Sequence, residues 1–118
     1  MLASAQNGPA VAQDRQGQYV QVAEIEIDPI QLEAYKAAVR EQIETAIRVE
    51  PGVLVLYSVA EKDNPNHIRV FEIYRDTDAH KSRLNTEHFK KYKATTEKMV
   101  KSLKLVQVTP IILRAKAM

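Results

Sequence analysis

The stretch from Val53 to Ala60, VLVLYSVA, is the strongest constraint on how this chain folds. It is apolar almost without interruption and rich in β-branched residues, so it predicts a central β-strand with both faces covered. Glu50-Pro51-Gly52 precedes it and ends any helix, because proline disfavours helical backbone before it and glycine permits a positive φ angle. The turn-forming run over 62–66 follows, and His67 to Tyr74 then indicates a second strand. Together the two strands predict a hairpin.

Two further elements are predicted before this hairpin. Residues Tyr19 to Ile27 alternate between apolar and polar side chains, which predicts a half-buried strand. Asp28-Pro29 is a typical helix start. Apolar residues then recur at three- and four-residue steps to about Val49. This spacing predicts an amphipathic helix that covers an apolar surface.

Three elements are predicted after the hairpin. Thr77 is a candidate cap for a short helix ending near Leu84, and Thr86 for a second helix over 87–103. The segment 105–115 predicts a last strand, in which Pro110 marks a bulge or an unpaired edge. The resulting order β-α-β-β-α-β predicts an α+β, ferredoxin-like fold, with a four-stranded antiparallel sheet and helices on one face.

The predicted helices leave one face of the sheet without a second layer. Residues 53–60 and 111–113 are nevertheless apolar on both sides of their predicted strands. A second copy of the chain, packed sheet against sheet, is the simplest way to cover that face. The sequence therefore predicts a homodimer.

Composition excludes several classes of protein. The 118 residues suit one domain, and 45% hydrophobic with 27% charged residues is close to the globular average. A formal net charge of +2 is weak for a nucleic-acid-binding protein, and the lysines over 90–101 are expected to form a solvated helix face. The absence of cysteine excludes disulfides and thiolate chemistry. No run approaches the roughly 18 apolar residues that a membrane-spanning helix needs.

The first 18 residues differ from the rest of the chain. They are small and polar without a helical or strand period, so residues 1–18 are expected to be a flexible tail and residues 19–118 the folded domain. The segment Leu2 to Ala5 resembles the cleavage end of a signal peptide, but the basic and apolar regions that precede such an end are missing. Both a cytoplasmic location and export to the periplasm stay open.

Few residues have the spacing of a chemical site. His67, His80 and His88 do not stand at metal-ligand spacing, so no metal site is expected. His67 and His80 are interpreted as exposed. His88 falls in the first turn of a predicted helix, where the partial positive charge favours a neutral imidazole that can exchange protons near neutral pH. A plain surface histidine is the alternative interpretation.

Three aromatic residues lie on the predicted hairpin, namely Tyr57, Phe71 and Tyr74. Packing in the core is the ordinary interpretation of such residues. The alternative is that they line an apolar pocket between the sheet and the helices, with the phenol hydroxyls as its few polar groups.

Four segments together resemble the antibiotic biosynthesis monooxygenase (ABM) family, including its quinol monooxygenase-like members. These are Glu50-Pro51-Gly52 before the apolar strand, the turn 63–66, the segment 71–76, and Thr86 to Tyr92 with its His-Phe pair. The resemblance extends from about Val20 to Leu113 and implies a dimeric α/β-barrel. Members include cofactor-free oxygenases of phenols or quinols, haem-degrading enzymes with a pocket tryptophan that this chain lacks, and a sugar-phosphate isomerase.

The resemblance implies a small monooxygenase that uses O₂ on a phenolic or quinol-like substrate without a cofactor. His88 and Arg83 are the expected catalytic residues. Many relatives carry a histidine at the position of Arg83, which cannot accept a proton but can stabilise negative charge. The expected substrate-binding residues are Tyr57, Phe71, Tyr74, Phe89 and His80. The alternatives are an isomerase or lyase acting on a small anionic carbonyl compound, and a non-catalytic dimer that binds a small ligand.

Overall fold

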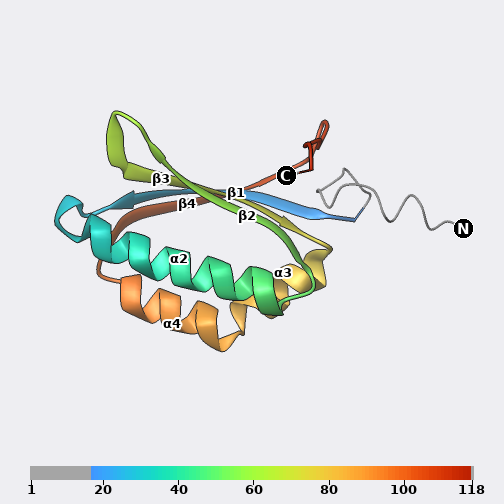
Figure 1. Cartoon of the computed structure of the whole chain (residues 1–118), viewed down its shortest axis with the longest axis horizontal. Helices are drawn as coiled ribbons and strands as arrows, with labels where there is room; N and C mark the ends of the chain where they lie inside the picture. The colour runs from blue at the N-terminus through green and yellow to red at the C-terminus, as the bar shows by residue number, and fades with distance from the viewer. Residues whose placement is uncertain (1–16, 118) are drawn as a thin grey trace, which may run out of the picture.

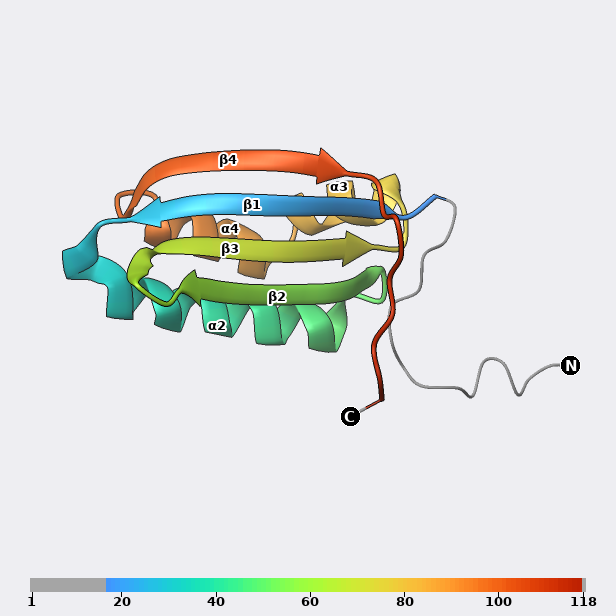
Figure 2. The same ribbon diagram turned by 90° about the horizontal axis from the view of Figure 1, so that it is seen from above.

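Four antiparallel strands form one sheet, and the helices lie on one of its faces (Figure 1). The computed structural model describes residues 17–117, so most of the expected tail lies outside the described residues. The strands are β1 (Tyr19–Ile27), β2 (Val53–Glu61), β3 (Asn64–Tyr74) and β4 (Val100–Val108). The helices are η1 (Pro29–Gln31), α2 (Leu32–Val49), α3 (Thr77–Leu84) and α4 (Glu87–Thr96). Seen from above, the strand order is β2-β3-β1-β4 (Figure 2), which confirms the ferredoxin-like α+β prediction.

The main core lies between β1 and the long helix α2. Because side chains alternate along a strand, the odd-numbered residues of β1 face the helices. Ala23, Ile25 and Ile27 are buried there, against Tyr35 and Val39 of α2. The predicted alternation of β1 and the apolar stripe of α2 are therefore confirmed.

The turn between α2 and β2 depends on close packing. Glu50 caps α2, its N–H donating to the Ala46 carbonyl, and its backbone is extended before Pro51. Glycine is expected at this position because it permits a positive φ angle, but Gly52 does not have a positive φ. Instead, a Cβ atom at Gly52 would lie 2.5 Å from the Cβ of Ala79 in α3. Glycine is therefore required here because α3 packs directly against the turn.

The prediction that residues 53–60 form a central strand is wrong. β2 pairs only with β3 and lies at the edge of the sheet. Tyr57 and Val59 are each 59% exposed. An apolar run cannot distinguish a strand covered on both faces from an edge strand whose outer face is apolar. The hairpin itself is confirmed, although β3 begins earlier than expected, at Asn64.

The helix starts after the hairpin are partly as predicted. Thr86 caps α4, its hydroxyl accepting from the Phe89 N–H at 3.3 Å. The cap of α3 is Asp76 and not Thr77, because the Asp76 carboxylate accepts from the Ala79 N–H at 2.8 Å.

The end of the second predicted helix is wrong. α4 ends at Thr96 and β4 begins at Val100, which pairs with Ile27 of β1. Pairing with residues 20–27 of β1 overrides the weak helical period over 97–103. Pro110 therefore follows the last strand and does not interrupt it.

The face of the sheet that the helices leave open carries an apolar cluster. Val20, Val55 and Ile73 are buried in it, and Phe71, Val108 and Leu113 pack against them. After β4 the chain turns and crosses the ends of the other strands, as Figure 2 shows. Ile111 in this last segment is 95% exposed. We call the outward-facing side chains of the four strands, with Leu113, the open face.

Candidate functional site

Arg83 lies at the centre of a buried polar cluster between α2, α3 and α4. Its side chain is only 4% exposed. The guanidinium donates from Nη2 to the Gln42 side-chain carbonyl at 2.6 Å and from Nη1 to Glu50 at 3.4 Å. It also lies 4.9 Å from the centre of the Phe89 ring, a cation–π distance. Arg83 is thus tied to three separate segments.

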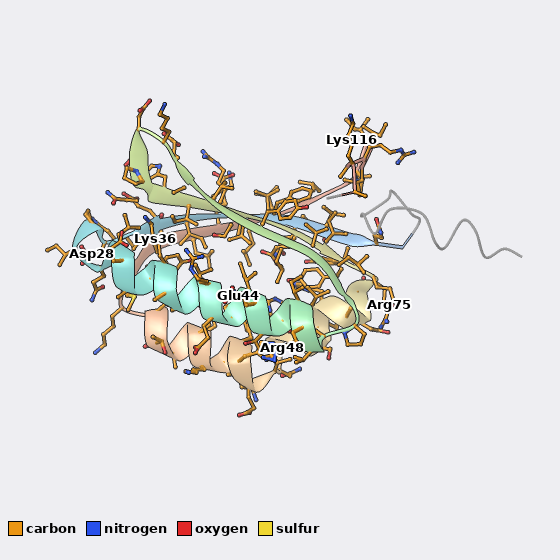
Figure 3. The ribbon with its side chains drawn as sticks, viewed as in Figure 1. Asp28, Lys36, Glu44, Arg48, Arg75 and Lys116 are labelled. Atoms are coloured by element: carbon orange, nitrogen blue, oxygen red, sulfur yellow. The ribbon has the colours of Figure 1, made fainter. Side chains whose placement is uncertain are left out.

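His88 reaches the same carboxylate from the first turn of α4. Its Nε2 lies 2.5 Å from Oε2 of Glu50, with side-chain exposures of 17% and 10% for the two residues. The pair lies at the wall of a hollow of about 430 Å³ between the α2–β2 turn and α3. Arg75 also lines this hollow and is seen in Figure 3 at the end of the molecule where α3 begins. A titratable group in a hollow, held by a carboxylate, is suited to proton transfer.

A second buried carboxylate lies near the end of β3, between the sheet and the helices. Glu72, on the helix-facing side of β3, is 8% exposed. It accepts from the Tyr74 hydroxyl at 2.5 Å and from the Gln21 side-chain amide at 3.3 Å. The Tyr19 hydroxyl in turn donates to the Gln21 carbonyl at 3.2 Å. Burial, reinforced by the Glu72 carboxylate and opposed by Arg83, raises the pKa of Tyr74 above its ordinary range.

His80 lies among these aromatic rings and is not simply exposed. It stacks on Tyr19 with ring centres 4.0 Å apart and meets Tyr74 edge-on at 5.0 Å. Burial lowers its pKa below the ordinary value, with Glu72 acting against that shift and Arg83 adding to it. The His80 imidazole is accordingly neutral at pH 7.

A pair of phenols links α2 with α4 beside the polar cluster. The Tyr35 and Tyr92 hydroxyls are 2.7 Å apart. Burial raises the pKa of both groups; the neighbouring Tyr92 adds to the shift of Tyr35, whereas the hydrogen bond from Tyr35 limits that of Tyr92. Both phenols stay protonated and hold the two helices together.

The structure brings together five of the seven expected site residues and separates the other two. His88, Arg83, Phe89, His80 and Tyr74 lie on the helix side of the sheet. Tyr57 pairs with Phe71 across the β2–β3 ladder, and Phe71 packs in the apolar cluster of the open face. Residues 71 and 74 are an odd number apart on one strand and therefore point to opposite faces. A shared pocket for all three aromatics is excluded.

Several residues of the cluster were not expected. Glu72 could have been found, because it lies two residues before Tyr74 and must share its face. Gln42 interrupts the apolar stripe of α2, which is also a usable signal. In the sequence, Glu50 is only the first residue of the Glu-Pro-Gly segment that ends a helix. The fold places its carboxylate beside Arg83 and His88.

The described residues contain neither a metal-binding cluster nor a membrane-spanning helix. In residues 17–117, no group of three or more His, Cys, Asp or Glu side chains could hold a metal ion. No helix in the described part of the chain is long and apolar enough to cross a membrane.

Similar structures share this fold. One is a candidate antibiotic biosynthesis monooxygenase from Bacteroides thetaiotaomicron, with 50% identity over 87% of this chain and 98% of that one, and a TM-score of 0.83. A candidate monooxygenase from Lactobacillus acidophilus is 25% identical over 92% of this chain, with a TM-score of 0.84. This chain spans only 53% of the Lactobacillus protein. A third, from Nitrosomonas europaea, is 24% identical over 83% of this chain and 95% of that one, with a TM-score of 0.76.

The family assignment rests on sequence as well as on fold. A comparison with curated proteins found no match. The family model described as antibiotic biosynthesis monooxygenase, ABM, matches residues 18–95, which include every element from β1 to most of α4. The chain therefore belongs to the antibiotic biosynthesis monooxygenase family.

Proposed function

We propose that this chain is a cofactor-independent monooxygenase that acts on a phenolic or quinol-like small molecule. The observation that carries the proposal is the Glu50–His88 pair at the wall of the hollow, with the positive charge of Arg83 next to it. A proton acceptor beside a fixed positive charge favours the deprotonated form of a phenol. Membership of a family named for monooxygenation supports this reaction class.

The chemistry needs little from the protein. A phenol that has lost its proton can itself pass an electron to O₂, so the protein supplies a base, a positive charge and protection from water. For a quinol, one molecule of substrate and one of O₂ give one hydroxyquinone and one water. The substrate supplies all the electrons that O₂ takes up, and no separate reductant is consumed.

Each residue of the cluster has a part in this proposal. His88 takes the phenolic proton, and Arg83 stabilises the negative charge that results. His80 and Phe89 are half-buried and do not line the hollow; Phe89 packs against the Arg83 guanidinium, and His80 fills the space between Tyr19 and Tyr74 behind the site. Tyr74 is almost fully buried and supports the His80 ring from behind. Tyr57 and Phe71 take no part, because they lie on the open face.

The test is oxygen uptake with a panel of quinols and polycyclic phenols. We expect turnover in air that stops without O₂ and falls by about 10²-fold or more in His88→Ala, the usual scale for losing a positioned base. The matched control is His67→Ala, since His67 lies on β3 beside Glu26 and far from the hollow in sequence and topology. Turnover that continues without O₂ would favour the isomerase or lyase. Ligand binding without any turnover would favour the binding module.

We also propose that the chain acts as a homodimer through the open face. Exposed apolar side chains on this face include Tyr57 and Val59 of β2. Tyr57 lies opposite Phe71, which packs in the apolar cluster around Val20 and Ile73, and Val59 follows two residues later on the same side of β2. An apolar surface of this kind is typical of interfaces between permanent subunits.

A further inference from the structure

The direction of the Glu50 side chain is fixed by its neighbours on both sides. The Glu50 N–H donates to the Ala46 carbonyl at 2.9 Å, which attaches the residue to the last turn of α2. Pro51 keeps the Glu50 backbone extended, with φ −104° and ψ 102°. Gly52 then lies against Ala79 of α3, so closely that no larger residue fits without a shift. The Glu-Pro-Gly turn therefore directs one carboxylate towards α3 and α4.

Two cationic or proton-carrying side chains meet the same oxygen of that carboxylate. Oε2 of Glu50 lies 2.5 Å from Nε2 of His88 and 3.4 Å from Nη1 of Arg83. The other guanidinium nitrogen, Nη2, is held by Gln42 at 2.6 Å. Arg83 thereby fixes the position of the carboxylate, since it is itself anchored to α2.

The contact decides which imidazole nitrogen carries the proton. An ionised carboxylate only accepts hydrogen bonds, so the His88 nitrogen facing it must be the N–H. In neutral imidazole the other nitrogen, Nδ1, then carries the lone pair. Within residues 17–117 no hydrogen bond reaches Nδ1, whereas Nε2 is fully engaged.

We propose that Glu50 is a positioning residue that fixes His88 as the Nε2–H tautomer and so makes Nδ1 the nitrogen that accepts the proton. The catalytic half of this inference rests on the proposed function; the tautomer itself does not. In the step, the phenolic O–H bond breaks, an Nδ1–H bond forms, and phenolate and imidazolium result. The Glu50 carboxylate stabilises the imidazolium, as an acidic partner does in a catalytic triad. No oxidant is needed for this step.

The direct test is ¹⁵N NMR of the imidazole rings at a pH where histidine is neutral. The chain has only three histidines, so His67→Ala and His80→Ala assign the signals of His88. We expect a protonated Nε2 and an unprotonated Nδ1 for His88. A protonated Nδ1, or a mixture of both tautomers, would overturn the inference. Because this measurement uses the wild-type protein, it does not depend on how any variant of Glu50 folds.

The second test is the variant Glu50→Gln. The new amide can donate to Nε2, which shifts His88 towards the Nδ1–H tautomer. The matched control is Glu41→Gln, the same change at an exposed glutamate of α2 that pairs with Lys91; it keeps the Glu50–His88 contact and the wild-type tautomer. With an active wild type, we expect Glu50→Gln to lower kcat by about 10²-fold or more with little change in KM.

An unchanged tautomer or an unchanged kcat in Glu50→Gln would refute the positioning role. A wild type with the expected tautomer but no turnover would refute only the proposed function.

Discussion

Arg83 shows how one buried charge organises a site. From the sequence, Arg83 is expected to bind or stabilise an anion directly. Its donors are instead directed at Gln42 and Glu50, and its flat face lies over Phe89. A guanidinium offers several donors in a fixed plane, which suits it to joining groups from different elements. We therefore assign Arg83 an effect through its charge and through Glu50.

The small size of Gly52 is required for this arrangement. We predict that Gly52→Ala destabilises the fold by about 1–3 kcal/mol, because its Cβ would lie too close to that of Ala79. Urea unfolding measures the change. In an Ala79→Gly background the same substitution should cost clearly less, since the opposing methyl group is gone. Equal penalties in both backgrounds would mean that the close approach is not the cause.

Tyr74 gives a prediction at alkaline pH. Burial first, and the Glu72 carboxylate second, raise the pKa of the folded phenol above its ordinary 10.0. Because the unfolded chain loses this proton first, the contribution to stability is complete below pH 10 and is lost as the pH rises further.

The measurement is the free energy of unfolding between pH values of about 10 and 11.5, where one such group contributes a fall of about 1.4 kcal/mol per pH unit. Tyr74→Phe should make this fall shallower by about 1.4 kcal/mol per pH unit, the contribution of one group, whatever the substitution does to absolute stability. Identical slopes for the two proteins would contradict a buried, protonated Tyr74.

At the scale of elements, helix starts place the site. Asp76 begins α3, which carries His80 and Arg83, and Thr86 begins α4, which carries His88 and Phe89. Both caps are short polar side chains that accept a backbone N–H. The orientation of four site residues thus depends on two local hydrogen bonds.

The cap of α3 is tested by two neighbouring substitutions. Asp76→Ala should lower stability by about 1 kcal/mol, the usual value of such a cap. Thr77→Ala should change it by less than about 0.5 kcal/mol, because Thr77 is exposed and lies inside the helix. Thermal unfolding of both variants is sufficient. A larger loss of stability for Thr77→Ala than for Asp76→Ala would mean that Thr77 is the cap of α3, as the sequence predicts.

Most of the element order could be predicted from the sequence, and the failures have physical reasons. Alternation in β1 and the stripe of α2 are local patterns, so both were found. The boundary between α4 and β4 was missed because pairing with β1 is a distant interaction. The edge position of β2 was missed because an apolar run does not show which of its faces is covered.

The candidate site could be predicted only in part. Motif residues such as His88 and Arg83 were found, and alternation along β3 could have separated Phe71 from Tyr74. Glu50 and Glu72 were not found as site residues. Their roles come from distant partners, Glu50 with His88 and Arg83, and Glu72 with Gln21. A single sequence does not contain such pairings explicitly.

At the scale of the whole molecule, the open face should hold two copies together. We predict that the wild type is a dimer at micromolar concentration and that Val59→Lys weakens or abolishes it, because a charge would be buried in an apolar interface. Ile47→Lys is the matched control, since Ile47 is exposed on α2, away from the open face. Light scattering measures the molar mass in solution of the wild type and of the two variants. A monomeric wild type, or equal effects of both substitutions, would contradict this assembly.

The most direct test of the account is the fate of labelled oxygen. The wild type is incubated with a quinol that it oxidises under ¹⁸O₂, and the rapidly quenched product is analysed by mass spectrometry, beside His88→Ala and His67→Ala. The account predicts one labelled oxygen in each product molecule, the other in water, and product formation that is lost in His88→Ala but kept in His67→Ala. Product without label from ¹⁸O₂, or equal formation by His88→Ala and the wild type, would contradict the proposed monooxygenase and the role of His88 in it.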